Sequence, residues 1–128
     1  MTKREFLKQV YHNYNLSADE DIFKVHNTAI ITKTGIQKIC AKENFNYRFD
    51  IVRCEPDYCA VKCEVLDSDF QTLATSFGSA EASNVKNKQK YYLEMAEKRA
   101  KARAVLIAIG AHGYLYSEDE ADDFKRQQ

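Results

Sequence analysis

Apolar side chains recur with helical spacing in three segments of this 128-residue chain. The first two segments, residues 3–14 and 32–44, are short, and the second opens on a threonine that can serve as an N-cap. The third, residues 87–110, contains no Pro and no Gly before Gly110, a residue type that readily adopts the left-handed C-cap conformation. We therefore predict two short helices and one long C-terminal helix.

Between the second and third helical segments, apolar and polar residues alternate in residues 47–54, 58–66 and 70–78. Short turns rich in Asp, Ser and Pro separate these segments, which is typical of antiparallel strands joined by tight turns. In the third strand we expect Leu73 and Phe77 to face the core. The predicted fold class is α+β, with a three-stranded antiparallel β-meander, a preceding helix and a long C-terminal helix packed on one face.

Length and composition predict one folded domain over residues 1–116, because 45% of the residues are hydrophobic and 30% are charged. Residues 118–123 hold five acids and no base, so we expect residues 117–128 to form an acidic, mobile tail. The chain opens on a polar segment and has no apolar run of about 18 residues. A cytoplasmic protein without a membrane segment is expected.

The formal net charge is zero, yet residues 86–103 carry seven Lys or Arg against two Glu. Lys98 and Lys101 each have a Glu four residues earlier, the favourable orientation for a helical ion pair. Arg99 and Arg103 have no such partner in the sequence, and their spacing makes them repel each other. Two interpretations stay open: a solvated helix face with snorkelling arginines, or a guanidinium pair that binds phosphates.

A second candidate anion site is the N-terminus of the helix that follows Thr32. Two interpretations stay open here as well: its unpaired N–H groups, the helix dipole and Lys33 together hold a phosphate, or the threonine serves only as a cap. Tyrosines also alternate with basic residues, as in Tyr47-Arg48 and around Tyr58. This pattern is typical of single-strand nucleic-acid binding, but the tyrosines are equally compatible with core positions.

No phosphate-binding glycine loop, zinc-protease motif or serine-nucleophile motif occurs in the chain. The three histidines are scattered, and the four cysteines form no CxxC. We expect the cysteines to be reduced core thiols, with a disulfide or a metal site as the alternative. The sequence therefore predicts no enzyme, no catalytic residue, no metal, no cofactor and no small-molecule substrate.

The segment AEKRAKARAVLIAIGAHGYLY, preceded by three short strands, resembles the signature helix of the single-strand DNA annealing proteins of the Rad-fifty-two type. The upstream segment TKTGIQKICAKENF resembles the lead-in helix of their short phage and mobile-element relatives. The resemblance covers about residues 30–116. The matching residues of the signature helix are Ala96, Lys98, Arg99, Ala100, Arg103, Ala104, Ile109 and Gly110.

The resemblance implies a protein of DNA recombination or repair that binds single-stranded DNA without sequence preference and anneals complementary strands. It also implies a homo-oligomer, either a ring or a filament, in which no bond is made or broken. A protein-interaction module and a double-stranded-RNA-binding-like domain, which shares the α-β-β-β-α order, remain alternatives. The residues expected to contact DNA are Arg99, Arg103, Lys98, Lys33 and Lys88.

Overall fold

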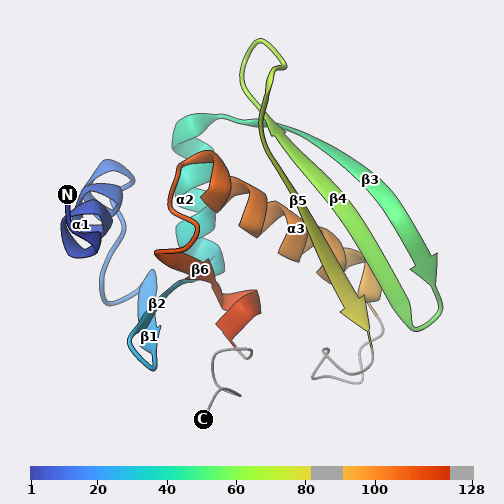
Figure 1. The fold of residues 1–128 in the computed structure, drawn as a ribbon, viewed down its shortest axis with the longest axis horizontal. Helices are drawn as coiled ribbons and strands as arrows, with labels where there is room; N and C mark the ends of the chain where they lie inside the picture. Colours follow the sequence, from blue (N-terminus) through green and yellow to red (C-terminus); the bar gives the residue numbers. More distant parts are fainter. Residues whose placement is uncertain (82–90, 122–128) are drawn as a thin grey trace. The chain divides into compact units, whose positions relative to one another are not determined.

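The computed structural model describes residues 1–81 and 91–121 and has the predicted α+β fold (Figure 1). Its helices are α1 (Lys3–Asn13), α2 (Lys33–Glu43) and α3 (Tyr92–Ala108). The predicted meander consists of β3 (Asn46–Glu55), β4 (Tyr58–Leu66) and β5 (Thr72–Glu81). The remaining elements are β1 (Ile22–Val25), β2 (Thr28–Ile31), β6 (Leu115–Ser117) and the 3-10 helix η1 (Glu118–Glu120).

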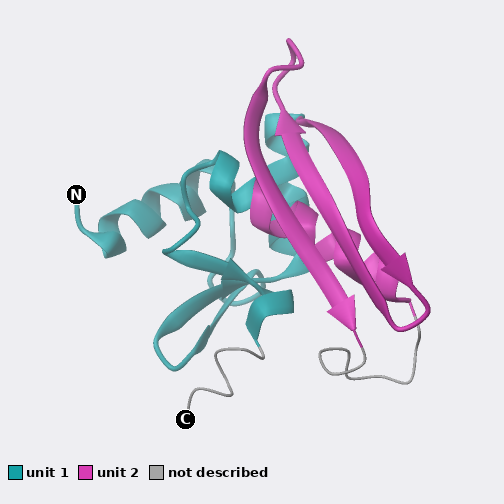
Figure 2. Ribbon diagram, turned by 45° about the vertical axis from the view of Figure 1, so that its right-hand side comes forward, with its two compact units in different colours: residues 1–44, 105–128 teal, residues 45–104 magenta. Residues whose placement is uncertain are grey.

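The chain forms two compact units, which Figure 2 distinguishes by colour. Unit 1 combines Met1–Asn44 with Val105–Gln128, and unit 2 is Phe45–Ala104. Helix α3 therefore contributes its longer, N-terminal part to unit 2 and its last turn to unit 1. None of the helices in the described ranges is long and apolar enough to cross a membrane.

Unit 1 contains a small sheet in the order β1-β2-β6, which the sequence analysis did not predict. His26 and Asn27 both have positive φ angles and form the two-residue turn between antiparallel β1 and β2. Strand β6 then pairs in parallel with β2, and Ile30 and Leu115 are fully buried. Strands of three or four residues are too short to leave a clear periodic pattern in the sequence.

The predicted helix boundaries of unit 1 are confirmed. The Thr32 hydroxyl accepts a 3.2 Å hydrogen bond from the Gly35 N–H at the start of α2, and Asn44 ends the helix with a left-handed φ of 54°. Ser117 is buried at the end of β6, and Ala121 is 4% exposed. The acidic segment therefore starts within the folded structure rather than in a tail beginning at residue 117, whereas residues 122–128 lie outside the described residues.

Unit 2 is the antiparallel meander β3-β4-β5 with α3 packed on one face, as predicted (Figure 1). The alternation along β4 is confirmed, because Cys59, Val61 and Cys63 are at most 2% exposed while Lys62 and Glu64 lie on the opposite face. Strand β3 is at the edge of the sheet, and its residues from Arg48 onward are exposed. The sheet thus buries the middle strand much more completely than β3.

The predicted orientation of the third strand is wrong. Leu73 and Phe77 are 47% and 52% exposed, and the buried face of β5 is instead made of small residues that include Ser76 and Gly78. The strand also begins at Thr72 rather than residue 70, because the Asp67 carboxylate accepts the N–H groups of two turn residues, each at 2.9 Å. The turn is consequently longer than predicted.

Helix α3 ends at the predicted residue and is buried in unit 2 mainly through small side chains. Gly110 has a φ of +76°, and the following N–H donates back to the Leu106 carbonyl at 2.9 Å. Tyr91, which directly precedes the helix, is 60% exposed. The fully buried residues of the helix within unit 2 include three alanines at four-residue spacing, Ala96, Ala100 and Ala104. The predicted start at residue 87 falls in residues 82–90, outside the described ranges.

Candidate nucleic-acid interface

Helix α3 approaches β5 so closely that backbone lies against backbone. A Cβ placed on Gly78 would lie deep inside van der Waals contact with the Ala96 carbonyl oxygen and the Ala100 nitrogen, and 3.0 Å from the Ala100 Cα. Only glycine fits at this point of the strand, and only small residues fit on the facing side of the helix. The alanine repeat of the helix therefore has a packing role in unit 2.

Arg99 and Arg103 lie on either side of this close contact and bind β5. Arg99 Nη1 donates to the Ser79 carbonyl at 2.7 Å, and Arg103 Nη1 donates to the Phe77 carbonyl at 3.1 Å. These carbonyls are two residues apart and so point to the same side of the strand. The two arginines, which have no Glu four residues earlier in the helix, thus have backbone carbonyl partners on β5, and their role in DNA contact stays a prediction.

The other basic residues predicted on the C-terminal helix occupy different surroundings. Lys98 is exposed, and the neighbouring Lys101 places its Nζ 4.6 Å from the ring centroid of Tyr47, a cation–π contact with β3. Lys88 lies outside the described residues. The structure thus brings Arg99, Arg103 and Lys98 onto one segment of α3 and gives the two arginines contacts with β5.

We expect Arg99→Ala to lower the free energy of unfolding by about 1–2 kcal/mol, because it leaves the Ser79 carbonyl without its charged donor. Lys98→Ala, an adjacent exposed change with the same loss of charge, is the matched control and should change stability by at most about 0.5 kcal/mol. Urea denaturation of both variants measures the difference. Equal stabilities would show that the Arg99 contact does not support the helix–strand packing.

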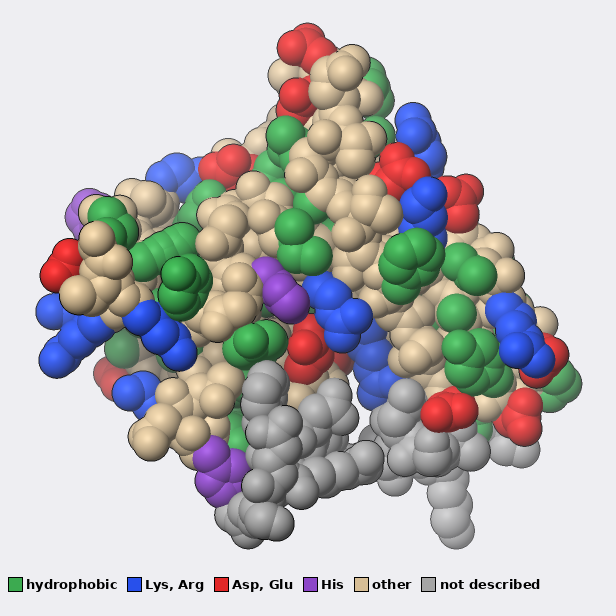
Figure 3. Space-filling view, in the orientation of Figure 1, with side chains coloured by type: hydrophobic (Ala, Val, Ile, Leu, Met, Phe, Trp, Pro, Cys, Tyr) green, Lys and Arg blue, Asp and Glu red, His purple; other side chains and the backbone are tan. Residues whose placement is uncertain are grey.

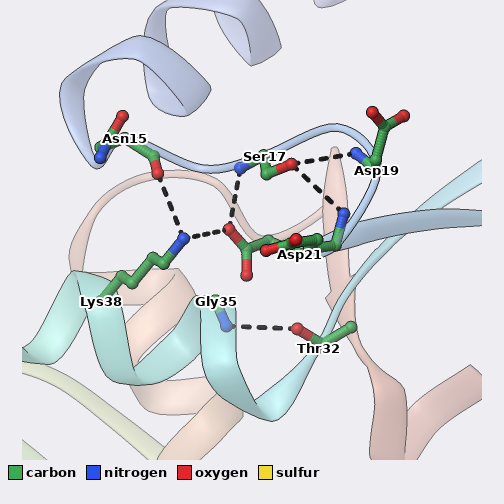
Figure 4. Close-up of polar contacts among 8 residues, drawn as sticks. Asn15, Ser17, Asp19, Asp21, Thr32, Gly35 and Lys38 are labelled. Atoms are coloured by element: carbon green, nitrogen blue, oxygen red, sulfur yellow. Dashed lines mark hydrogen bonds and ion pairs between the residues drawn. The ribbon is translucent and has the colours of Figure 1, made fainter.

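The N-terminus of α2, where Lys33 was expected to help hold a phosphate, already binds a carboxylate of unit 1. The Lys33 N–H donates to Glu118 Oε1 at 2.7 Å. The Thr32 hydroxyl accepts from the Gly35 N–H, as Figure 4 shows. The favourable interaction between the helix dipole and an anion is therefore made by η1. The Lys33 side chain itself is exposed.

On the outer face of the meander, basic and acidic side chains stand next to each other. Glu64 accepts from Arg48 Nη1 at 3.1 Å and pairs with Lys62 Nζ at 3.2 Å, and Arg53 pairs with Glu55 at 2.8 Å. The hydrogen bond from Lys62, together with the two positive charges, lowers the pKa of Glu64 despite its partial desolvation. Figure 3 shows this interleaving of charges over the strands of unit 2. This face is therefore not a continuous cationic surface.

Unit 1 contains a basic groove that the sequence analysis missed. It has a volume of about 760 Å³ and lies between α1 and the β1–β2 hairpin. Leu7, Tyr11 and Ala29 contribute to its apolar lining. Burial raises the pKa of Tyr11 above its ordinary value. The cationic side chains around the groove, hereafter the basic groove residues, are Lys3, Arg4, Lys8 and Lys24.

The basic groove residues form no ion pair with any carboxylate in the described parts of the chain. Arg4 and Lys8 are four residues apart on α1, a spacing at which like charges destabilise a helix unless an anion is present. The spacing of Arg4 and Lys8 was the one sequence signal that could have indicated an anion site on α1. Lys24 could not have been assigned to the same site, because it lies on β1 and only the folded chain brings it close to α1.

Within the described ranges, no cluster of three or more His, Cys, Asp or Glu side chains is placed to hold a metal ion. Comparison with known proteins found no matching family model, no matching curated protein and no matching solved structure.

Proposed function

We propose that this protein binds single-stranded DNA without sequence preference and anneals complementary strands during recombination or repair. The observation that carries the proposal is the groove of unit 1, where four cationic side chains surround an apolar lining and have no carboxylate partner among the described residues. Such a concentration of like charge attracts a polyanion, because binding releases the counterions condensed on the nucleic acid.

The mixed character of the groove favours a single strand over a duplex. Its cations suit phosphates, and Leu7 and Tyr11 offer apolar surface to bases or sugars, which a duplex keeps inside its stack. Binding through the backbone would leave base edges available for pairing with a second strand. Annealing in this form requires no covalent step, so the proposed activity is not enzymatic.

The residues first predicted to contact DNA belong to the proposal as a second set. Arg99 and Arg103 each donate from a guanidinium nitrogen to a β5 carbonyl, and these contacts hold the two guanidinium groups beside the helix. Lys98 and Lys33 are exposed. We include Lys88 on the sequence argument alone. The proposed location is the cytoplasm.

A protein-interaction module is the second candidate, and strand β3 favours it. Phe49, Ile51 and Val52 are 37%, 61% and 58% exposed on a ten-residue strand at the edge of its sheet. Long, apolar edge strands pair readily with another chain. In the annealing proposal this edge serves a second copy of the protein, giving the ring or filament.

Fluorescence anisotropy with a labelled thymidine oligonucleotide tests the proposal. We expect Arg4→Gln/Lys8→Gln to weaken binding about tenfold and to reduce the slope of log K against log salt by about 1.4, at ~0.7 for each lost phosphate contact on a single strand. Arg48→Gln/Arg53→Gln removes the same charge from paired residues of unit 2 and is the matched control. Equal weakening by both pairs would contradict a groove-specific contact.

The same titration with duplex DNA and duplex RNA separates the alternatives. Tighter binding to duplex RNA would favour the double-stranded-RNA-binding-like domain, and no binding to any nucleic acid at low salt would leave the protein-interaction module. Pairing of two labelled complementary strands, followed with and without protein, tests annealing. A rate unchanged by the protein would overturn the annealing step while leaving single-strand binding intact.

A further inference from the structure

Cys54 and Cys59 face each other across the β3–β4 hairpin of unit 2. They are paired directly in the antiparallel register, and their Sγ atoms are 2.8 Å apart. Only four residues, Glu55, Pro56, Asp57 and Tyr58, separate the two cysteines along the chain. The short connection keeps the two thiols together as long as the hairpin is formed.

This geometry suits a covalent bond between the two sulfur atoms. Residues directly opposite in an antiparallel pair have Cα atoms about 4.5–5.5 Å apart. That separation lies inside the range of about 4.4–6.8 Å found across disulfides. From the observed contact, the sulfur atoms need to approach by less than about 1 Å to reach the bonded distance of ~2.05 Å. No rearrangement of the strands is required.

The two thiols differ in their access to solvent. Cys54 is exposed, whereas Cys59 is 2% exposed on the buried face of β4. Burial, reinforced by the contact with Cys54, raises the pKa of the Cys59 thiol to about 11. A reagent in solution therefore meets Cys54 first, and Cys59 reacts only with a sulfur already held beside it.

We propose that Cys54 and Cys59 are a site of reversible oxidation, converted to an intramolecular disulfide by exchange with a low-molecular-weight disulfide such as oxidised glutathione. The Cys54 thiolate attacks one glutathione sulfur, which breaks the glutathione disulfide and releases one glutathione thiolate that is then protonated. Cys59 next loses its proton and attacks Cys54 Sγ, releasing the second glutathione. Two protein thiols are oxidised, one glutathione disulfide is reduced to two thiols, and the reaction reverses in excess reduced glutathione.

The disulfide would tie the exposed edge strand β3 to β4 at the hairpin end of the sheet. Because oxidation depends on a geometry inside unit 2, the inference is independent of DNA binding. The inference also gives a chemical reason for the exposure of Cys54. The other three cysteines, Cys40, Cys59 and Cys63, are buried or half-buried.

Equilibration of the folded protein with oxidised glutathione, followed by alkylation, digestion with trypsin and mass spectrometry, tests the proposal. Cleavage after Arg53 and Lys62 releases residues 54–62, which contain Cys54 and Cys59 and no other cysteine. We expect this peptide to lack both alkyl groups and to weigh two hydrogen atoms less than the reduced form. Recovery of the peptide with both thiols alkylated would overturn the proposal.

Two single variants test the order of the steps. Cys59→Ser should trap glutathione on Cys54, because the second thiol is missing, whereas Cys54→Ser should leave Cys59 unmodified in the folded protein. Cys40→Ser is the matched control and should form the 54–62 disulfide as the parent protein does. A parent protein that carries glutathione stably on Cys54 would show that the two sulfurs do not react and would also overturn the proposal.

Discussion

Gly78→Ala is expected to lower the free energy of unfolding by about 3 kcal/mol or more, because the added methyl group has no space beside α3. The new Cβ would overlap the Ala96 carbonyl oxygen and the Ala100 nitrogen. Both are backbone atoms of a helix, so no side-chain rotation can relieve the overlap. The helix must instead move away from β5, which weakens the hydrogen bonds of Arg99 and Arg103. Urea denaturation measures the loss.

A second substitution in the facing helix distinguishes this backbone contact from ordinary side-chain crowding. Ala100→Gly removes a Cβ from α3 but leaves the overlapping nitrogen in place, so it should not rescue Gly78→Ala and should itself cost about 1 kcal/mol as a helical glycine. Thr75→Ala, on the exposed face of the same strand, is the control and should change stability by about 0.5 kcal/mol at most. Recovery of stability in the double variant would refute the backbone contact.

Sequence periodicity was sufficient where a segment was long and its caps were chemically distinct. Thr32, Asn44 and Gly110 all occupy the helix ends predicted from their residue types. The alternation along β4 predicted its buried face because every second residue is an apolar or small thiol side chain. These signals are local, and they need no knowledge of which other element packs nearby.

The orientation of β5 could not be obtained in this way, because the facing helix decides it. Leu73 and Phe77 are the more hydrophobic choice for a core, yet α3 lies too close to β5 for large side chains at the facing positions. The small residues around Gly78 occupy that space. The alternation of small and large side chains along β5 has the two-residue period of a strand. Hydrophobicity alone, however, selects the face with Leu73 and Phe77 as the buried one, which is the wrong face.

The candidate site shows the same division between local and long-range information. Spacing correctly placed Arg99 and Arg103 one helical turn apart, but their partners are carbonyls of a strand 20 and 26 residues earlier in the chain. The basic groove depends on a hairpin that brings Lys24 towards α1. The chemistry of each residue could therefore be predicted from the sequence, whereas its neighbours could not.

Lys38→Met is expected to reverse the pH dependence that Asp21 gives to the stability of unit 1. Asp21 is fully buried, and its Oδ2 accepts from Lys38 Nζ at 2.6 Å and from the Ser17 N–H at 2.8 Å (Figure 4). Oδ1 has no hydrogen-bond donor in the described residues. Burial acts to raise the pKa of Asp21, but the Lys38 hydrogen bond, the Ser17 hydrogen bond and the Lys38 charge together lower it below its ordinary value.

The lowered pKa of Asp21 determines the direction in which the stability of the parent protein changes with pH. Its folded state binds the Asp21 proton more weakly than the unfolded chain, where the pKa of Asp is ~3.9. The stability that ionised Asp21 contributes is therefore complete above that pH and is lost as the pH falls towards the pKa of the folded state. In Lys38→Met, burial outweighs the remaining Ser17 hydrogen bond and the pKa rises. The free energy of unfolding of the variant should then fall as the pH rises above about 4, because ionised Asp21 is buried without its lysine partner. We expect a loss of about 2–3 kcal/mol near neutral pH. The figure is moderate because Lys38 is partly exposed in the parent protein, where solvent screens its interaction with Asp21.

Urea denaturation of both proteins between acid and neutral pH measures this reversal. Lys42→Met, four residues further along α2, is the matched control, because Lys42 donates to the Asn13 carbonyl and lies over the Tyr14 ring without pairing with a carboxylate in the described chain. It should preserve the parent's pH dependence in the acid range. If Lys38→Met instead loses the same stability at every pH, the lysine contributes packing alone and the Asp21 carboxylate is not the group that it stabilises.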